Sequence, residues 1–298
     1  MLPRFKKFGR CRSITYPLSG FKIKNDKLHL NKIGSIKIWL YRKIQAHIKT
    51  LTVKRLSSGK WYACFSCIVE ARPMVKPFKD IGIDLGVSSY AMLSNGIRLE
   101  NPRFYRKSEK RLAHLQRGLS RKEKGGRNWL KAKTKAARLH EKTLNRRNDF
   151  LQKASRKIAN TYEKIYVEDL KIMNMVRNRN LAKLISDAGR GRFIGMIAYK
   201  AESAGGRVIQ VNPRNTSLIC SQCMERVKKF LSDRIHECPF CGLRMDRDHN
   251  AALNILTRER EIGKELAKLK PGGEETSTSL SEEVQDSLMK QEASLLLG

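Results

Sequence analysis

Hydrophobic and polar residues alternate along the first part of the chain, which is the pattern of half-buried β-strands. Three stretches show it most clearly: 35–40, 47–54 and 61–69. The turn residues Ser57, Ser58 and Gly59 predict a hairpin between the last two. We therefore expect a β-rich, nucleic-acid-binding domain at 1–75 in the form of a small barrel. The lysines of these strands would face a phosphate backbone; the alternative is that they face solvent. They are Lys37, Lys49 and Lys54.

The pattern changes after residue 76. An apolar strand at 79–86 and two short strands around the turn at 94–96 are followed by leucines at helical spacing, which predict a helical hairpin at 103–160. The later elements are a strand, a helix, a strand and a helix, at about 165–168, 185–205, 207–211 and 248–257. Three antiparallel strands followed by this alternation is the layout of a ribonuclease-H-like α/β domain.

The charge of the chain points to a polyanionic partner. The formal net charge is +34, from 62 Lys and Arg against 28 Asp and Glu. The basic residues are spread widely, which favours nucleic acid over a membrane surface, with a ribosomal-type basic protein as the alternative. The hairpin at 103–160 alone holds twenty basic and four acidic residues, so we expect it to face phosphates. No signal peptide is visible, and we expect a cytoplasmic, nucleoid-associated protein of prokaryotic type.

Two Cys-x-x-Cys pairs predict a structural Zn²⁺ site. Fourteen residues separate the pairs, and four thiolates at that spacing can close a tetrahedron at about 2.3 Å from the metal. The predicted ligands are Cys220, Cys223, Cys238 and Cys241. Such a site has no open position for chemistry. A further pair, Cys64 and Cys67, lies inside a predicted strand, where its side chains point to opposite faces, so we interpret these two as packing residues.

Acidic residues stand at the ends or starts of three predicted elements. Asp84 lies in the apolar strand at 79–86 with glycines on both sides, and Glu168 ends a strand, where α/β sheets bind ligands. A carboxylate buried in a strand is costly unless it is paired or binds a cation. A turn-capping role is the alternative for Asp84, and we expect Asp169 to cap the segment that follows it.

Asp246 and Asp248 compete for the third acidic position. Either could cap the helix that begins near Ala251, and we favour Asp248 because it lies within one turn of the helical run. In a ribonuclease-H-like domain the central strand, the fourth strand and the last helix converge. Asp84, Glu168 and Asp248 could then hold two catalytic Mg²⁺ ions, or Mn²⁺ in their place, about 4 Å apart.

Taken together, these motifs resemble the OrfB/TnpB family of transposon-associated proteins, which have a RuvC nuclease domain and are related to type V CRISPR effectors. The likeness runs from about residue 3 to residue 257, and its β-rich start resembles the family's wedge domain. The resemblance implies an RNA-guided, Mg²⁺-dependent DNA endonuclease that binds a DNA target and a guide RNA but no membrane. It also implies that Asp84, Glu168 and Asp248 are the RuvC acids and that the four knuckle cysteines bind zinc.

The resemblance also sets the expected domain boundaries. After the wedge-like part, the nuclease domain would span 76–214, the zinc ribbon 215–245, and the last motif with its helix 246–262, followed by a disordered polar tail at 263–298. Family members begin with a further recognition segment, so we expect a shortened protein. Met224 stands where glycine is common, for which we expect only a local adjustment. The alternatives are an RNA-guided DNA-binding protein that does not cut and a strand-joining transposase.

Overall fold

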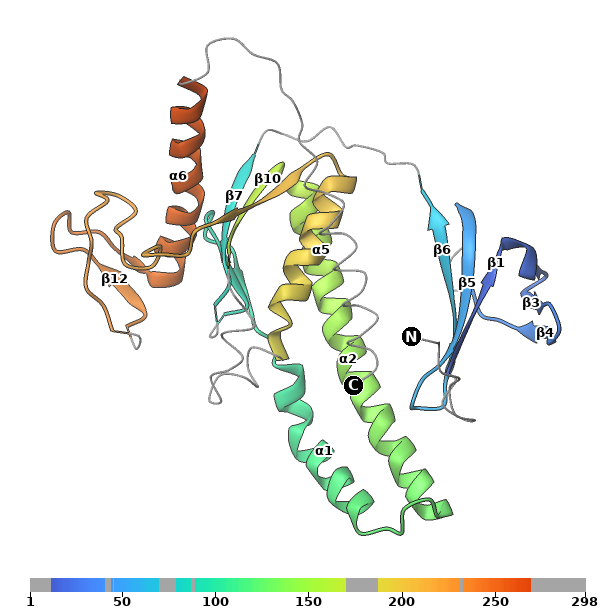
Figure 1. Cartoon of the computed structure of the whole chain (residues 1–298). Coiled ribbons are helices and arrows are strands. Elements are labelled where there is room, and N and C mark those ends of the chain that lie inside the picture. Colours follow the sequence, from blue (N-terminus) through green and yellow to red (C-terminus); the bar gives the residue numbers. More distant parts are fainter. Residues whose placement is uncertain are drawn as a thin grey trace, which may run out of the picture. The chain divides into compact units, whose positions relative to one another are not determined.

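The computed structural model of the chain describes residues 12–40, 44, 46–69, 79–86, 89–169, 187–230 and 233–268, the last ten of these as backbone only. The chain divides into two compact units (Figure 1). One comprises Met1–Ala71 and Phe104–Asn148, and the other comprises Arg72–Arg103 and Asp149–Gly298. The predicted tail beyond 268 and the segment that follows Asp169 lie outside the described residues.

The first unit contains two three-stranded antiparallel sheets, ordered β1-β5-β6 and β2-β3-β4. The strands are β1 (Ser13–Pro17), β2 (Phe21–Lys24), β3 (Lys27–Leu30), β4 (Gly34–Lys37), β5 (His47–Arg55) and β6 (Trp61–Ile68). A short 3₁₀ helix, η1 (Leu18–Gly20), connects β1 to β2. The predicted hairpin at Ser57–Gly59 is confirmed, since Arg55 pairs with Trp61. The first predicted strand is shorter than expected, because β4 ends at Lys37. The described strands form two separate sheets and do not show the predicted small barrel.

The predicted helical hairpin is confirmed as α1 (Phe104–Ser120) and α2 (Arg127–Thr161). Within the first unit, Glu141 of α2 is buried beneath the β5–β6 hairpin. Its carboxylate accepts hydrogen bonds from the Tyr62 hydroxyl at 2.7 Å and the Lys60 ammonium at 3.2 Å. These donors, together with Ser58, lower the pKa of Glu141 against the opposing effect of burial. The sequence did not predict this contact.

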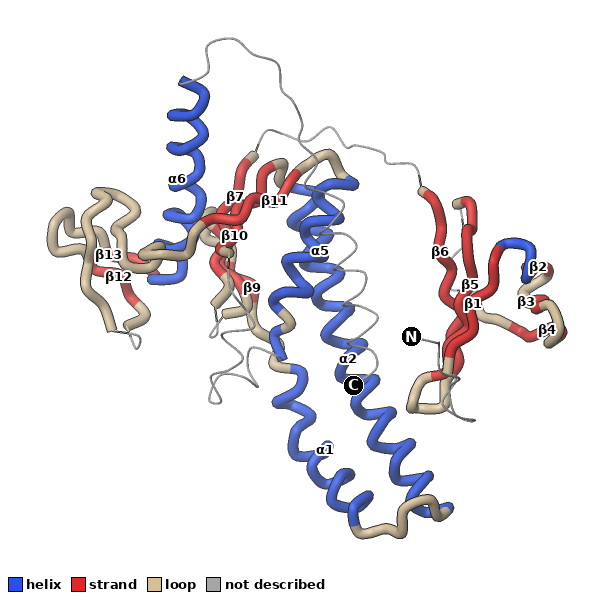
Figure 2. The backbone as a smooth tube through the Cα atoms, viewed as in Figure 1, coloured by secondary structure: helices blue, strands red, loops and turns tan. Residues whose placement is uncertain are grey.

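The second unit is built on a five-stranded sheet ordered β11-β10-β7-β8-β9 (Figure 2). Its strands are β7 (Asp80–Asp84), β8 (Ala91–Leu93), β9 (Arg98–Leu99), β10 (Lys164–Glu168) and β11 (Arg207–Val211). The first three are antiparallel, whereas β10 runs parallel to both β7 and β11. The strand that carries Asp84 is therefore central, as the sequence predicted.

Helices cover both faces of this sheet. On one face, isoleucine and valine side chains of β7 and β10 pack against α2 and α5 (Arg190–Ser203) and form the main core. On the other face lies α6 (Arg247–Lys268), with Tyr166 and Ile255 in a second cluster (Figure 1). Gly82 also points to this face, where a Cβ atom would lie only 2.2 Å from the Ala252 carbonyl oxygen. The absence of a side chain at Gly82 lets α6 lie directly on β7.

Two short antiparallel strands, β12 (Ile235–Glu237) and β13 (Arg244–Asp246), lie in the segment between β11 and α6. The last helix follows β13 without a loop and runs to Lys268, beyond the predicted boundary at 262. Within the described part of the chain, no helix is both long enough and apolar enough to cross a membrane.

Candidate functional site

Strand alternation places two of the three candidate acids on one face of the sheet. Successive side chains of a strand point to opposite faces, so Asp84 lies on the same face as Gly82, and Glu168 on the same face as Tyr166. Both acids end their strands, and these strands are hydrogen-bonded neighbours with Ile83 paired to Val167. This face is the one that α6 covers, so both carboxyl groups stand at the edge nearest the first turn of α6.

Asp248 reaches this edge from the first turn of α6. The residue is 8% exposed, and its Oδ2 atom would lie 3.2 Å from a Cβ atom at Gly86, two residues beyond Asp84. Ser89 Oγ donates a hydrogen bond to the same oxygen at 3.4 Å, and Arg247 Nε lies 3.7 Å from the other oxygen. The structure thus brings the three predicted acids to one edge. Among the described residues, their carboxylates do not form a cluster with all ligand atoms within 4.8 Å.

The electrostatics of this edge are those of crowded, buried carboxyl groups. The pKa of Asp84 is raised to about 8, by burial first and then by the negative charges of Glu168 and Asp248, while Arg190 and Arg247 oppose the rise. Burial also raises the pKa of Glu168. Ionising Asp84 and Glu168 together is costly without a cation, and carboxylate oxygens are the ligands that Mg²⁺ prefers. The donor set therefore fits divalent metal ions.

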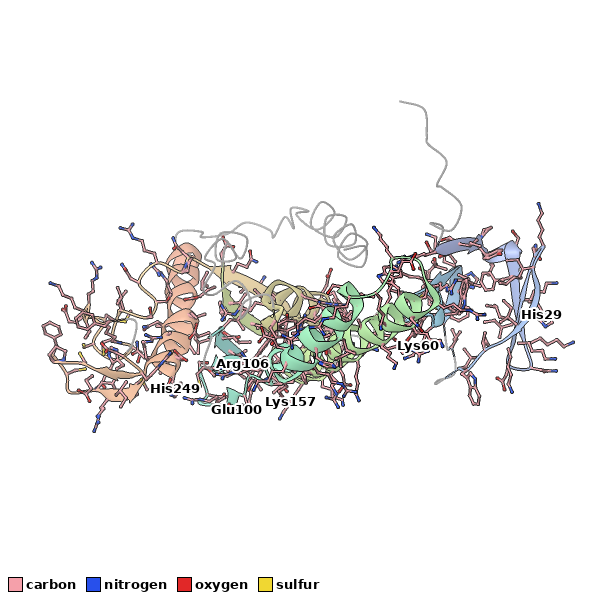
Figure 3. The ribbon with its side chains drawn as sticks, turned by 90° about the horizontal axis from the view of Figure 1, so that it is seen from below. His29, Lys60, Glu100, Arg106, Lys157 and His249 are labelled. Carbon is pink, nitrogen blue, oxygen red and sulfur yellow. The ribbon has the colours of Figure 1, made fainter. Side chains whose placement is uncertain are left out.

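Asp246 has a different environment from Asp248. Its Oδ1 atom accepts hydrogen bonds from the backbone N–H groups of Asp248 at 2.9 Å and His249 at 3.2 Å, so it caps α6. Its Oδ2 atom is paired with Arg98 at 2.5 Å. His249, at the start of α6 (Figure 3), donates from Nε2 to the Ser94 carbonyl oxygen at 3.1 Å. The cap is thus Asp246, and Asp248 is the acid near Asp84.

Arg190, the first residue of α5, is a buried cation near these acids. The sequence had placed it only within a predicted helix. Arg190 is 3% exposed, and its Nη2 atom donates a hydrogen bond to the Gly86 carbonyl oxygen at 2.6 Å. Burial lowers its pKa, whereas the charges of Asp84 and Glu168 raise it. It thus ties Gly86, just beyond β7, to α5 and places a positive charge near both acids.

The four predicted zinc ligands come together. Their sulfur atoms all lie within 4.8 Å of one another, with Cys220 and Cys241 at 3.6 Å and Cys223 and Cys238 at 3.5 Å. Four sulfurs at 2.3 Å from a tetrahedral zinc ion are about 3.8 Å apart, so the cluster fits a structural zinc ion. Burial opposes ionisation of Cys238, but the backbone N–H groups of Cys241 and Phe240 lower its pKa to about 7.

The two knuckles have matching backbone turns. The N–H of Met224 donates to the Cys220 carbonyl oxygen at 3.0 Å, and the N–H of Gly242 donates to that of Cys238 at 2.9 Å. Both residues have left-handed backbones, with φ of 64° at Met224 and 74° at Gly242. The first knuckle therefore has a side chain at a position where glycine is favoured.

Comparisons with known proteins agree with this architecture. The model of the family described as "Probable transposase", OrfB_IS605, matches residues 64–179, and the model "Cas12f1-like, TNB domain" matches residues 191–255. InsQ of Escherichia coli K12, named "Putative RNA-guided DNA endonuclease", is 36% identical over 273 residues, covering 85% of this chain and 67% of that protein. The chain belongs to the OrfB/TnpB family. This confirms the resemblance that the sequence motifs suggested.

Other relatives extend the family comparison. A Streptomyces pristinaespiralis protein with the same descriptive name is 35% identical over 260 residues, covering 85% of this TnpB-family chain and 64% of the relative. The chain thus spans about two thirds of the length of these two relatives. A solved Cas12f1–sgRNA–target DNA complex is a distant likeness, with a TM-score of 0.49 and 22% identity over 70% of this chain and 45% of that one.

The interpretation of Cys64 and Cys67 is partly corrected. Cys64 is exposed and Cys67 is half-buried, in line with opposite faces of β6, and neither joins a metal-binding group among the described residues. The exposure of Cys64 contradicts a packing role, because β6 covers the core of its unit with one face only.

In this TnpB-family chain, the sequence did not predict the contacts of three polar residues near Glu168 and the first knuckle. Thr216 donates a hydrogen bond to Glu168, and both Asn250 and Asn254 bind the backbone that precedes the first knuckle. Thr216 has no local signature. The two asparagines did have one, because they lie four residues apart within an otherwise apolar helical stretch and so share a face.

Proposed function

We propose that the chain contains the RuvC-like nuclease domain of an RNA-guided DNA endonuclease. In this proposal Asp84, Glu168 and Asp248 hold two Mg²⁺ ions and the domain hydrolyses phosphodiester bonds in DNA. The observation that carries the proposal is the meeting of three acids from β7, β10 and α6 at one edge of a sheet with ribonuclease-H-like strand order. The names of the two relatives, and the family to which the chain belongs, support the same activity.

The surroundings of each residue indicate its proposed role at the metal site. Burial, followed by the negative charges of Glu168 and Asp248, raises the pKa of Asp84, so the three acids act on one another and would together hold the ions. When bound, the ions would activate the attacking water and stabilise the leaving oxygen. Arg190 holds the Gly86 carbonyl and so keeps the end of β7 in place, while its charge offsets part of the repulsion between the acids.

Nucleic-acid partners follow from charge and exposed aromatic groups. The hairpin of α1 and α2 holds most of the twenty basic residues at 103–160, and we assign it to phosphate contacts with the guide RNA and the DNA target. In the β-rich unit, which we assign to the wedge-like role, Trp61 is 62% exposed and the Arg55 guanidinium lies 5.7 Å from the centroid of its ring. An exposed ring beside a cation suits stacking on a base.

The test is Mg²⁺-dependent cleavage by the chain purified with its bound RNA, with DNA matched to that RNA as substrate. Asp84→Ala and Glu168→Ala should abolish cleavage while zinc content and nucleic-acid binding stay unchanged. Asp149→Asn, which changes an exposed acid paired with Lys153 on α2, is the matched control and should cleave normally. Undiminished cleavage by both alanine variants would overturn the assignment. RNA binding by the wild-type chain without any cleavage would favour a binding protein instead.

A further inference from the structure

Thr216 is placed to orient one of the proposed metal-binding acids. It is 3% exposed, and its hydroxyl group lies within hydrogen-bond distance of Glu168 Oε1 and, at 3.1 Å, of the Pro213 carbonyl oxygen. A hydroxyl group has only one proton to donate, and a carboxylate is the stronger acceptor. The Thr216 proton therefore goes to Glu168. Binding one oxygen in this way leaves the other oxygen of Glu168 for a metal ion.

Two side-chain amides of α6 hold Thr216 and its neighbours. Asn254 Nδ2 donates to the carbonyl oxygens of Thr216 and Ile219, both at 2.7 Å. One turn earlier, Asn250 Nδ2 donates to Ile219 O at 2.7 Å and its Oδ1 accepts from the Ser221 N–H at 2.9 Å. Both asparagines are buried, so these bonds are shielded from competing water.

The clamped segment, 216–221, connects the two proposed metal sites. Its first residue binds Glu168, and Cys220 near its other end is one of the four knuckle cysteines. The helix that clamps it also carries Asp248 in its first turn. The position of Glu168 and the position of a zinc ligand are thus set by the same six residues.

We propose that Thr216 is a positioning residue for Glu168, and that Asn250 and Asn254 clamp the segment 216–221 so that the zinc ribbon and the metal-binding acid are held in register. The proposal rests on the proposed function in one respect, because it takes Glu168 as a ligand of the catalytic metal ions. Partners that orient a ligand from outside the metal's own shell commonly change metal affinity or activity by about 10- to 100-fold when they are lost.

Binding of Mn²⁺ to the full chain without nucleic acid, measured from the free-ion electron paramagnetic resonance signal, gives a readout independent of cleavage. Thr216→Val should weaken Mn²⁺ binding by about 10-fold with zinc content unchanged. Thr216→Ser, which keeps the hydroxyl, should restore it. The matched control is Thr143→Val, because Thr143 is also buried and bonded to a side chain and a backbone carbonyl, but within α1 and α2. It should leave Mn²⁺ binding unchanged.

Two further variants separate the proposals. Asn250→Ala should weaken Mn²⁺ binding and also lower zinc retention during dialysis against a chelator, whereas Thr216→Val should affect Mn²⁺ alone. Glu168→Gln should weaken Mn²⁺ binding at least as much as Thr216→Val. If Glu168→Gln weakens binding and Thr216→Val does not, the positioning role is wrong and the proposed function stands. If Glu168→Gln itself has no effect, the proposed function fails.

Discussion

Replacing Gly82 with alanine tests the packing that brings Asp248 to Asp84. The added Cβ would lie 2.2 Å from the Ala252 carbonyl oxygen, 2.8 Å from the Leu256 nitrogen and 3.0 Å from the Leu256 Cβ. Two of these atoms are backbone atoms of α6, so no side chain can rotate away. Because ordinary contacts lie near 3.5 Å, the helix must move from β7 by roughly 1 Å.

The expected cost of Gly82→Ala follows from that displacement. Overpacking a core typically costs about 1–3 kcal/mol, and a clash with helix backbone belongs at the upper end of this range. The smaller entropy of the unfolded alanine chain returns about 0.4–1 kcal/mol. We expect a net loss of about 2 kcal/mol in the free energy of unfolding. Misplacing a catalytic group by 1 Å can also cost about 10²-fold in rate, so cleavage should fall sharply in the molecules that remain folded.

Circular dichroism during urea unfolding measures the stability change. All three tryptophans, Trp39, Trp61 and Trp129, belong to the first unit, so Gly82→Ala should leave their fluorescence spectrum in the folded protein unchanged. The matched variant is Gly118→Ala on α1, where a Cβ meets nothing within 4 Å and should stabilise the helix by about 0.5–1 kcal/mol. A Gly82→Ala chain with wild-type stability and cleavage would refute the packing of α6 on β7.

Three other predictions concern the ribbon and a buried lysine. Cys220→Ser or Cys238→Ser should unfold the ribbon, since structural zinc contributes on the order of 10 kcal/mol, and unchanged zinc stoichiometry would contradict this. Met224→Gly should stabilise the ribbon by about 1 kcal/mol in thermal unfolding, because glycine adopts the left-handed backbone conformation at this exposed position without the strain that a Cβ atom causes. A lower melting temperature would count against that reasoning. Burial lowers the pKa of Lys200, on α5, from its ordinary 10.5 to about 8. Between these pH values the unfolded chain binds more protons than the folded chain, so the free energy of unfolding should rise with pH. Lys200→Met should remove that rise, and an unchanged dependence of the free energy of unfolding on pH would contradict this reasoning.

Local signals predicted the elements, and the order of the elements predicted that Asp84, Glu168 and Asp248 would converge. The strand at 207–211 and the end of the strand at Glu168 are where the sequence placed them, because both are short apolar runs bounded by polar residues. The central position of β7 followed from the order of elements. The preference for Asp248 over Asp246 followed from its distance to the helical run, and the structure adds the reason, which is that Asp246 caps the helix.

What the sequence could not predict are contacts between distant residues of ordinary type. Thr216 meets Glu168 across 48 positions, and Glu141 meets Tyr62 across 79. A threonine in a loop and a glutamate on a basic helix have the same local pattern whether or not they meet a partner. The prediction of a barrel was not confirmed for the same reason, because the alternation of apolar and polar residues predicts strands but not which strands pair at their edges.

The most direct test of the central claim compares two neighbouring aspartates in single-turnover cleavage of RNA-matched DNA with Mg²⁺. Asp248→Asn keeps the shape of the side chain but removes its charge, and we predict no detectable cleavage from a folded, zinc-loaded chain. Asp246→Asn removes charge from the cap and its pair with Arg98, costing about 1 kcal/mol in stability, and should still cleave. Wild-type cleavage by Asp248→Asn would contradict the assignment of the chemistry to Asp84, Glu168 and Asp248.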